Sequence, residues 1–205
     1  MGGVVMSFAR KWWGILPVLL CALLAVGCWA QFRQNQLASR MVRLHVVANS
    51  DSDEDQTLKL QVRDAVLERC RELLAGSDTA GDARETLEAA LPDLAAAGLA
   101  VVEEQGYDCS VAVSLEYTNF PTIDYGDFSL PAGDYQALWV ELGAGEGHNW
   151  WCVLFPGLCL EPVSDLAQSA MAEGLTEEDV ALLTKDGVDY VLRFRILELW
   201  DSICN

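Results

Sequence analysis

The stretch GHNWWCVLFPGLC, residues 147–159, brings together residue types that could carry chemistry. Its reactive or aromatic side chains include His148, Trp150, Trp151, Cys152 and Cys159. Such a set can bind a metal, activate a thiol, form a disulfide or make an aromatic surface that contacts another protein. Each of these uses needs different neighbours elsewhere in the chain.

The spacing of the ligands argues against a metal or cofactor. Structural zinc sites usually take about four Cys or His ligands in closely spaced pairs, and the closest cysteines in this chain are seven positions apart. The acidic stretch from Asp51 resembles the start of a calcium loop, but Gln56 stands in place of the turn glycine and Val62 in place of the final glutamate. We therefore expect neither a metal nor a cofactor.

A thiol enzyme is the alternative that the sequence leaves open. A cysteine nucleophile needs a base within hydrogen-bond reach, and the two histidines of the chain are His45 and His148. His148 lies near Cys152 in sequence, but Glu146 opposes the formation of a thiolate there. We expect no catalytic residues and no enzyme activity, with a cysteine-dependent hydrolase or transferase that acts on cell-wall or septal material as the alternative.

Cys152 and Cys159 are also the candidate disulfide. In a tight hairpin they would occupy diagonal positions, with backbones roughly 7 to 8 Å apart, which is at or beyond the limit for a bridge. A disulfide here therefore requires a wider, irregular loop around Pro156.

The adjacent tryptophans predict either core packing or a contact surface. If this stretch is a strand, Trp150 and Trp151 point to opposite faces, so one indole can fill the core while the other is exposed. An exposed indole beside other apolar side chains can anchor a protein partner. The candidate partner-binding residues are Trp150, Trp151, Phe155, Leu158 and His148.

Charge and hydropathy indicate where the protein works. Residues 1–50 contain no Asp or Glu, and Arg10 and Lys11 precede an uncharged apolar run over residues 12–30. We interpret residues 1–30 as a signal peptide or membrane anchor, residues 31–39 as a short linker and residues 40–205 as a single exported globular domain. The net charge of −18 argues against nucleic acid as a partner, and we expect no small-molecule substrate.

The remaining pattern predicts the fold class. Alternation over residues 42–48 indicates a strand with Arg43 and His45 on its solvent side, and a helix follows from Asp53, with a capping box to Gln56, to about residue 74. A second helix begins near residue 80, and Pro92 kinks it or opens a third. The other predicted elements are strands over residues 110–117, 135–143, 150–155 and 189–200, a loop over 119–131 and a helix from residue 176. We expect an α/β or α+β fold with a mixed sheet of about four to five strands and helices packed on one face.

Two long stretches resemble a known family. RLHVVANSDSDEDQTLKLQVRDAV, residues 43–66, and FPTIDYGDFSLPAGDYQALWVELGAGEGHNWWCVLFPGLC, residues 120–159, are similar to stage II sporulation protein R of endospore-forming bacteria. The likeness extends over roughly residues 40 to 161 and is looser beyond.

The resemblance implies a signalling role. Members of that family are made in the forespore and exported into the space between the two septal membranes. There they are required for activation of a membrane-embedded aspartic protease, which processes the precursor of sigma factor E. On this basis we expect a secreted signal whose partner is that membrane-bound protease. Residues 12–30 are either removed on export or retained as an anchor in the membrane. The resemblance assigns no contact residues, so the candidate residues above are our own inference.

Overall fold

The computed structural model describes residues 2–125, 128–157, 175–176 and 180 of the chain. It divides into two compact units, one of residues 1–36 with 187–205 and one of residues 37–186. The predicted domain boundaries at residues 30 and 39 stay predictions.

Helix α1 (Gly2–Ser39) contains the apolar run. Within the described residues, one helical stretch, Pro17–Ser39, is long and apolar enough to cross a membrane by length and composition. This helix is compatible with the predicted signal peptide or anchor. Residues 31–39, which we expected to be a linker, are helical as its C-terminal part.

A four-stranded mixed sheet forms the centre of the unit of residues 37–186. Its strands lie in the order β2 (Val111–Phe120), β5 (Gly133–Leu142), β1 (Val42–Val47) and β6 (Asn149–Phe155). β1 and β5 are parallel, whereas β2 pairs with β5, and β6 with β1, in antiparallel fashion. The predicted mixed sheet is confirmed.

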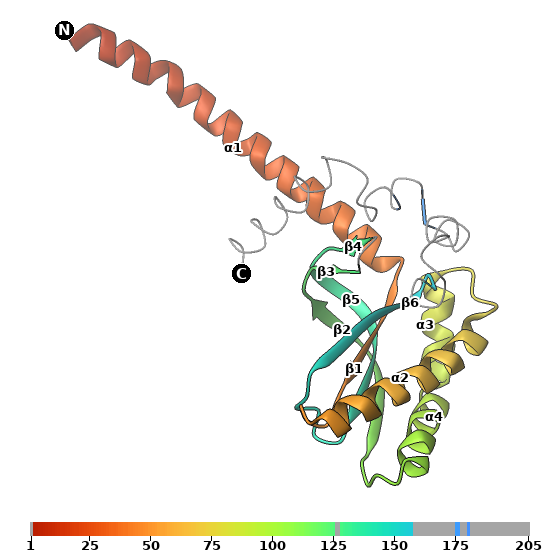
Figure 1. Ribbon diagram of the computed structural model, residues 1–205. Coiled ribbons are helices and arrows are strands. Elements are labelled where there is room, and N and C mark those ends of the chain that lie inside the picture. The colour runs from red at the N-terminus through yellow and green to blue at the C-terminus, as the bar shows by residue number, and fades with distance from the viewer. Residues whose placement is uncertain (1, 126–127, 158–174, 177–179, 181–205) are drawn as a thin grey trace. The chain divides into compact units, whose positions relative to one another are not determined.

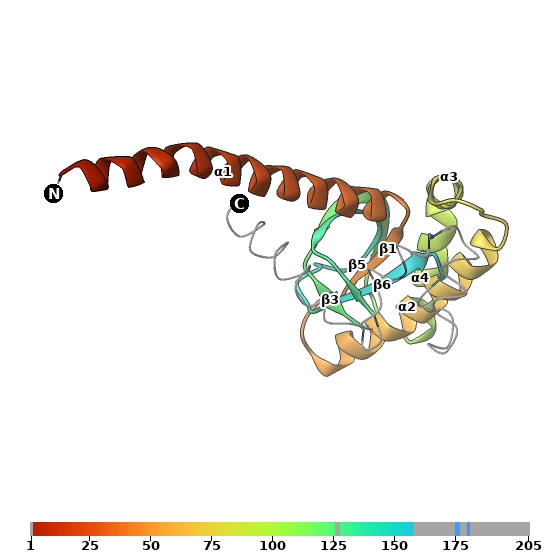
Figure 2. The same ribbon diagram turned by 90° about the horizontal axis from the view of Figure 1, so that it is seen from above.

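Three helices cover one face of this sheet: α2 (Asp53–Leu74), α3 (Ala80–Ala89) and α4 (Leu91–Glu104). Both ribbon views show them on the same side of the strands (Figure 1, Figure 2). The α+β fold with helices packed on one face is therefore confirmed. Pro92 lies in the first turn of α4, where its missing N–H costs nothing, so it opens a third helix.

The N-cap of α2 differs from the prediction by one residue. It is Ser52, whose side chain accepts a hydrogen bond from the Asp55 N–H at 3.1 Å. The predicted capping box between Asp53 and Gln56 is wrong, because the Gln56 amide instead donates to the Ser50 carbonyl at 2.9 Å. The acidic first turn still complements the positive end of the helix.

The core between the sheet and the helices follows the expected periodicities. Alternate residues of the strands point toward the helices, and the apolar stripe of α2 packs against them. The fully buried members of this helix-covered core include Leu44, Val46, Leu58, Val62, Val66, Leu138, Val140 and Leu142.

The opposite face of the sheet has its own apolar cluster. A two-stranded hairpin, β3 (Ile123–Asp124) with β4 (Ser129–Leu130), lies within the segment that we predicted as a loop. The buried members of the cluster are Leu37, Ala38, Met41, Phe120, Phe128, Leu130, Tyr135, Ala137, Val153, Leu175 and Val180. Because this face is covered, β1 is buried on both sides.

The prediction that Arg43 and His45 face solvent is therefore wrong. Arg43 is 0% exposed and His45 is 5% exposed. The predicted strand over residues 189–200 lies outside the described residues. Most of the helix predicted from residue 176 does so too. Of this helix, the hydrogen bond from the Val180 N–H to the Thr176 carbonyl is described.

Candidate functional site

Residues 48–56, which are the loop between β1 and α2 with the first turn of α2, meet the loop of residues 143–148 at one end of the sheet, and we call these two segments the loop junction. The first connects β1 to α2, and the second connects β5 to β6. The Gly147 N–H donates to the Ala48 carbonyl at 2.9 Å, the Ala144 N–H to the Asn49 side-chain oxygen at 3.0 Å, and the Glu146 N–H to the Asn49 carbonyl at 3.2 Å. The backbones of the two loops are thus joined directly.

Glycine is required in the second loop because the first one approaches so closely. A Cβ on Gly147 would lie 2.3 Å from the Ser50 carbonyl oxygen. A Cβ on Gly143, which has φ +58°, would lie 2.2 Å from the Asn49 side-chain oxygen. Both distances are far below van der Waals contact, so only glycine permits the junction as built.

A carboxylate organises the first loop. Asp55 Oδ2 accepts hydrogen bonds from the Ser50 hydroxyl at 2.5 Å and from the Asn49 amide at 2.9 Å. The bond from Ser50, followed by that from Asn49, lowers the pKa of Asp55 because both donors favour the charged form. The Asp55 carboxylate therefore fixes the Asn49 side chain, and Asn49 in turn accepts hydrogen bonds from the second loop.

The buried Lys59 of α2 links the helix to the loop junction through hydrogen bonds. Lys59 is 4% exposed, and its ammonium donates to the His148 carbonyl at 2.8 Å and to the Gln56 side-chain oxygen at 2.6 Å. Burial lowers the pKa of Lys59. Lys59 was not predicted as a site residue, although a lysine next to Leu58 on the apolar side of a helix indicates a buried cation with a specific partner.

Two side-chain pairs reach the surface beside the junction. Trp150 is 38% exposed, and the guanidinium of Arg63 on α2 lies 4.3 Å from its ring centroid. His148 is exposed, its backbone N–H donates to the Asp51 carboxylate at 2.7 Å, and its Nδ1 contacts the same oxygen. Arg63 and Asp51 were not predicted as site residues, because pairing across the fold leaves no mark in the sequence.

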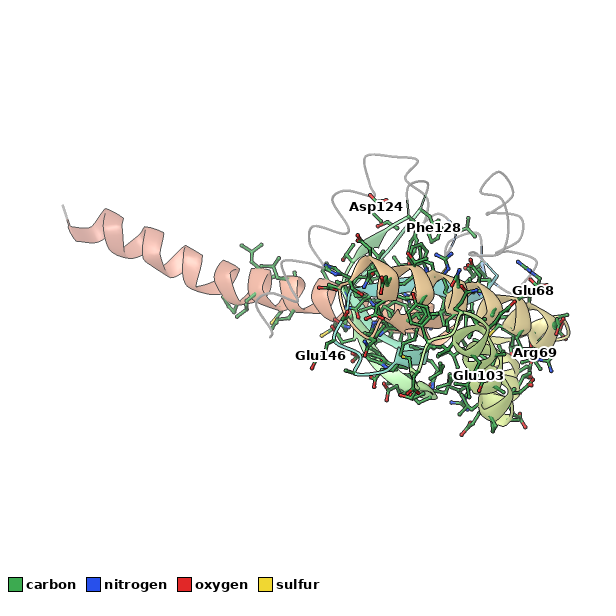
Figure 3. The ribbon with its side chains drawn as sticks, turned by 60° about the horizontal axis from the view of Figure 1, so that its bottom comes forward. Glu68, Arg69, Glu103, Asp124, Phe128 and Glu146 are labelled. Atoms are coloured by element: carbon green, nitrogen blue, oxygen red, sulfur yellow. The ribbon has the colours of Figure 1, made fainter. Side chains whose placement is uncertain are left out.

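The surroundings of these pairs are acidic. Asp51, Asp53, Glu54 and Glu146 are all exposed. In Figure 3, Glu146 lies at one end of the folded unit and Glu68 and Arg69 lie at the other. The junction therefore carries exposed carboxylates, and the partly exposed indole of Trp150 follows it in the chain.

The other predicted contact residues are less accessible. Trp151 is half-buried on the far face of the sheet, and Phe155 is 4% exposed within the helix-covered core. The exposed aromatic surface that we expected therefore does not include Phe155. Leu158 lies outside the described residues.

The geometry does not assemble the cysteine–histidine pair. Cys152 lies opposite Leu44 in the sheet and is 6% exposed on the helix-covered side. A strand advances about 3.3 Å per residue, so the Cα atoms of Asn149 and Cys152 are roughly 10 Å apart, and His148 precedes Asn149 just outside the strand. His45, next to Leu44 in β1, points to the other face. Neither histidine is placed to take a proton from Cys152.

The described free thiols of the folded unit, Cys70 and Cys109, are not activated. Burial raises the pKa of Cys70 to about 12, and burial also raises that of Cys109. Cys152 is not among the free cysteines of the described segments. Cys159 lies outside those segments, so the bridge between Cys152 and Cys159 stays a prediction. Nor do the described residues contain a cluster of three or more His, Cys, Asp or Glu suited to a metal ion.

Comparison with known proteins gives a family match. Residues 38–165 match the family model described as stage II sporulation protein R. Stage II sporulation protein R of Bacillus subtilis (strain 168) is 40% identical over 133 residues, which are 63% of this chain and 59% of that protein. The match thus spans about three fifths of the relative's length. No solved structure matches.

Proposed function

Because the chain belongs to the stage II sporulation protein R family, we propose that it is an exported sporulation signal that acts by protein–protein contact. In this proposal the folded domain works in the space between the forespore and mother-cell membranes. It binds a membrane-embedded aspartic protease, and the protease then processes the precursor of sigma factor E. The family match supports the sporulation role; the protease, the location and the contact mode are proposed.

The observation that carries the contact mode is the exposed indole of Trp150 beside the loop junction. The two stretches that resemble the family, residues 43–66 and 120–159, supply the two sides of this junction. Arg63 stacks on the indole and limits its motion. A preordered, partly exposed tryptophan is the kind of side chain that contributes most to protein interfaces.

The exposed carboxylates of the loop junction, next to Trp150 in the chain, indicate the chemistry of the partner surface. Asp51, Asp53 and Glu146 are exposed. A matching receptor surface would offer an apolar pocket for the indole with Lys or Arg around it, and these charges would raise the association rate at low salt. The signal activates the protease by binding its active state more tightly than its inactive state.

A substitution in sporulating cells tests the contact mode. Trp150→Ala removes the indole, and we expect at least a tenfold loss of sigma-precursor cleavage with the protein still folded and exported. Tyr117→Ala is the matched control, because Tyr117 is 71% exposed on β2, away from the junction, and cleavage should remain normal. Normal cleavage of the sigma precursor with Trp150→Ala would contradict the proposed contact.

Paired serine variants distinguish a cysteine-dependent enzyme from a signal that acts by contact. A nucleophile at Cys152 predicts that Cys152→Ser abolishes sigma-precursor cleavage while Cys159→Ser does not. A structural bridge predicts equal loss for both. The burial of Cys152 and its separation from both histidines favour the contact mode.

A further inference from the structure

β2 forms one edge of the four-stranded sheet. On one side it pairs with β5 over its whole length, from Val111 to Phe120, in a continuous register. On the other side, no strand of the described residues pairs with it. Natural proteins usually protect such an edge with a proline, a lysine or a bulge, but the β2 sequence VAVSLEYTNF contains neither proline nor lysine, and its register has no shift. This edge is therefore open to a further strand.

The hydrogen bond at the start of β2 shows which backbone groups point outward from the sheet. The Gly143 N–H donates to the Ser110 carbonyl at 2.9 Å, so the polar backbone groups of residue 110 face β5. In an antiparallel pair, residues that bond to the partner strand alternate with residues whose N–H and C=O point away from it. The outward backbone groups of β2 therefore belong to its odd-numbered residues, which are Val111, Val113, Leu115, Tyr117 and Asn119.

Apolar side chains with uncovered surface follow this edge. Val111, Val113 and Leu115 pack against the helix-covered core but are only partly buried. Tyr117 is 71% exposed. Glu116 is the one charged residue in the β2 sequence, although the whole chain has a net charge of −18. Two copies of this acidic chain can therefore approach each other along β2 with little electrostatic repulsion.

The β2 sequence is complementary to itself. When two copies of the strand run antiparallel about a two-fold axis at Leu115, Val113 lies opposite Tyr117 of the second copy, and Ser114 lies opposite Glu116. All the odd-numbered residues then face one another, and they form about ten hydrogen bonds if every outward group is used. An axis at Glu116 would instead place two carboxylates directly opposite each other, which is unfavourable. The axis at Leu115 therefore combines the longest overlap with apolar pairs and separated charges.

We propose that two copies of this chain associate through β2, so that their sheets are joined by antiparallel pairing about Leu115. A second copy fits this edge because the apolar pairs, the separated carboxylates and the full overlap all arise when the sequence pairs with itself. The association is weak, because the edge of a single strand buries less than the roughly 1,200 Å² of a standard specific interface. The dimer does not use Trp150 and does not depend on the proposed signalling function.

Analytical ultracentrifugation of the full chain in detergent tests the dimer. We expect wild type to dimerise with a dissociation constant of about 10 to 100 μM, in keeping with a small interface. Tyr117→Pro removes an outward N–H from each copy without removing a bond to β5, whereas Tyr117→Ala keeps that N–H. Both variants lack the phenol ring, so the difference between them reports the backbone bonds alone. We expect Tyr117→Ala to dimerise and Tyr117→Pro to associate at least about tenfold more weakly than Tyr117→Ala.

Backbone amide exchange of wild type gives a second readout, which holds even if Tyr117→Pro does not fold and which separates pairing through β2 from association through α1. The Ser114 and Glu116 amides bond to β5 and should be protected at every concentration. The Val113 and Leu115 amides should become protected only as the dimer forms. The proposal is overturned if wild type stays monomeric at about 1 mM, or if the Val113 and Leu115 amides exchange equally fast at low and high concentration. It is also overturned if folded Tyr117→Pro associates as tightly as Tyr117→Ala.

Discussion

The helix-covered core and the loop junction stabilise this protein in different ways. The core depends on apolar area: Leu44, Val46 and Leu138 pack against helices through contacts that need no particular partner atom. The junction depends on hydrogen bonds between two loops, and their backbones can approach this closely because glycine lies at the contact. Apolar burial therefore holds the domain together, while the junction fixes one surface, that of Trp150, in a defined position. Four substitutions, with expected effects on stability that range from large to small, test this division.

The largest effect belongs to the core. Leu138→Ala should lower the free energy of unfolding by about 2 to 5 kcal/mol, because Leu138 is fully buried between β1 and β2 and leaves a cavity. Urea unfolding of the full chain in detergent measures this loss. The same substitution at Leu99, which is 39% exposed on α4, is the control and should cost less than about 1 kcal/mol. Similar costs at the two positions would contradict the assignment of the core.

The second largest effect on stability is expected at Gly147, where the two loops of the junction approach each other closely. Gly147→Ala should cost about 2 to 3 kcal/mol, because the new methyl group would lie 2.3 Å from a backbone oxygen that cannot move cheaply. Gly76→Ala, where no atom lies within 4 Å of the added carbon, should change the free energy of unfolding by about 0.5 kcal/mol or less. If Gly147→Ala were equally harmless, the two loops would not be held together as described.

The carboxylate in the junction should have a smaller, pH-dependent effect. Asp55→Asn should cost about 1 kcal/mol at pH 7, because it weakens the hydrogen bonds from Ser50 and Asn49. The pKa of Asp55 is lower in the folded protein, so its contribution is present above the pKa of the unfolded chain, about 4, and is lost as pH falls through the folded value.

Denaturation of both proteins across this pH range measures the difference. The gap between wild type and Asp55→Asn should close as the pH drops below about 4. Asp78→Asn, at an exposed loop position, should show no comparable gap. A gap that widened toward acid would mean that folding favours the protonated form of Asp55, the opposite of what its hydrogen bonds require.

The smallest effect on stability is expected at the surface. Trp150→Ala should cost less than about 1 kcal/mol, since the indole is partly exposed and its main described contact is the stacking of Arg63. A loss as large as that of Leu138→Ala would mean that Trp150 is a core residue and would remove it from the contact surface. Thermal unfolding distinguishes the two outcomes.

Much of the helix-covered core could be predicted from sequence because local patterns determine it. The apolar stripe of residues 58–73 and the alternation in residues 110–117 each indicate one element and one buried face, and α2 begins within one residue of the predicted start and ends at the predicted residue. The small hairpin of β3 and β4 was missed because its strands are two residues each, too short for a pattern.

The site was harder to predict because it depends on contacts between distant residues. Asn49 and Ala144 are far apart in sequence, and no residue type at either position signals their bond. Arg43 and His45 were misplaced for a related reason. A polar residue in an alternating strand normally faces solvent, but here the hairpin and Met41 cover that face, and alternation cannot reveal a second layer.

Binding of the full chain in detergent to the extracytoplasmic part of the proposed partner, a membrane-embedded aspartic protease, tests the central claim most directly. Surface plasmon resonance with wild type, Trp150→Ala and the control Tyr117→Ala provides the measurement. We predict saturable binding for wild type and Tyr117→Ala and at least a tenfold weaker affinity for Trp150→Ala, in keeping with a loss of more than about 1.4 kcal/mol. Equal affinities for all three proteins, or no binding by wild type, would contradict the account.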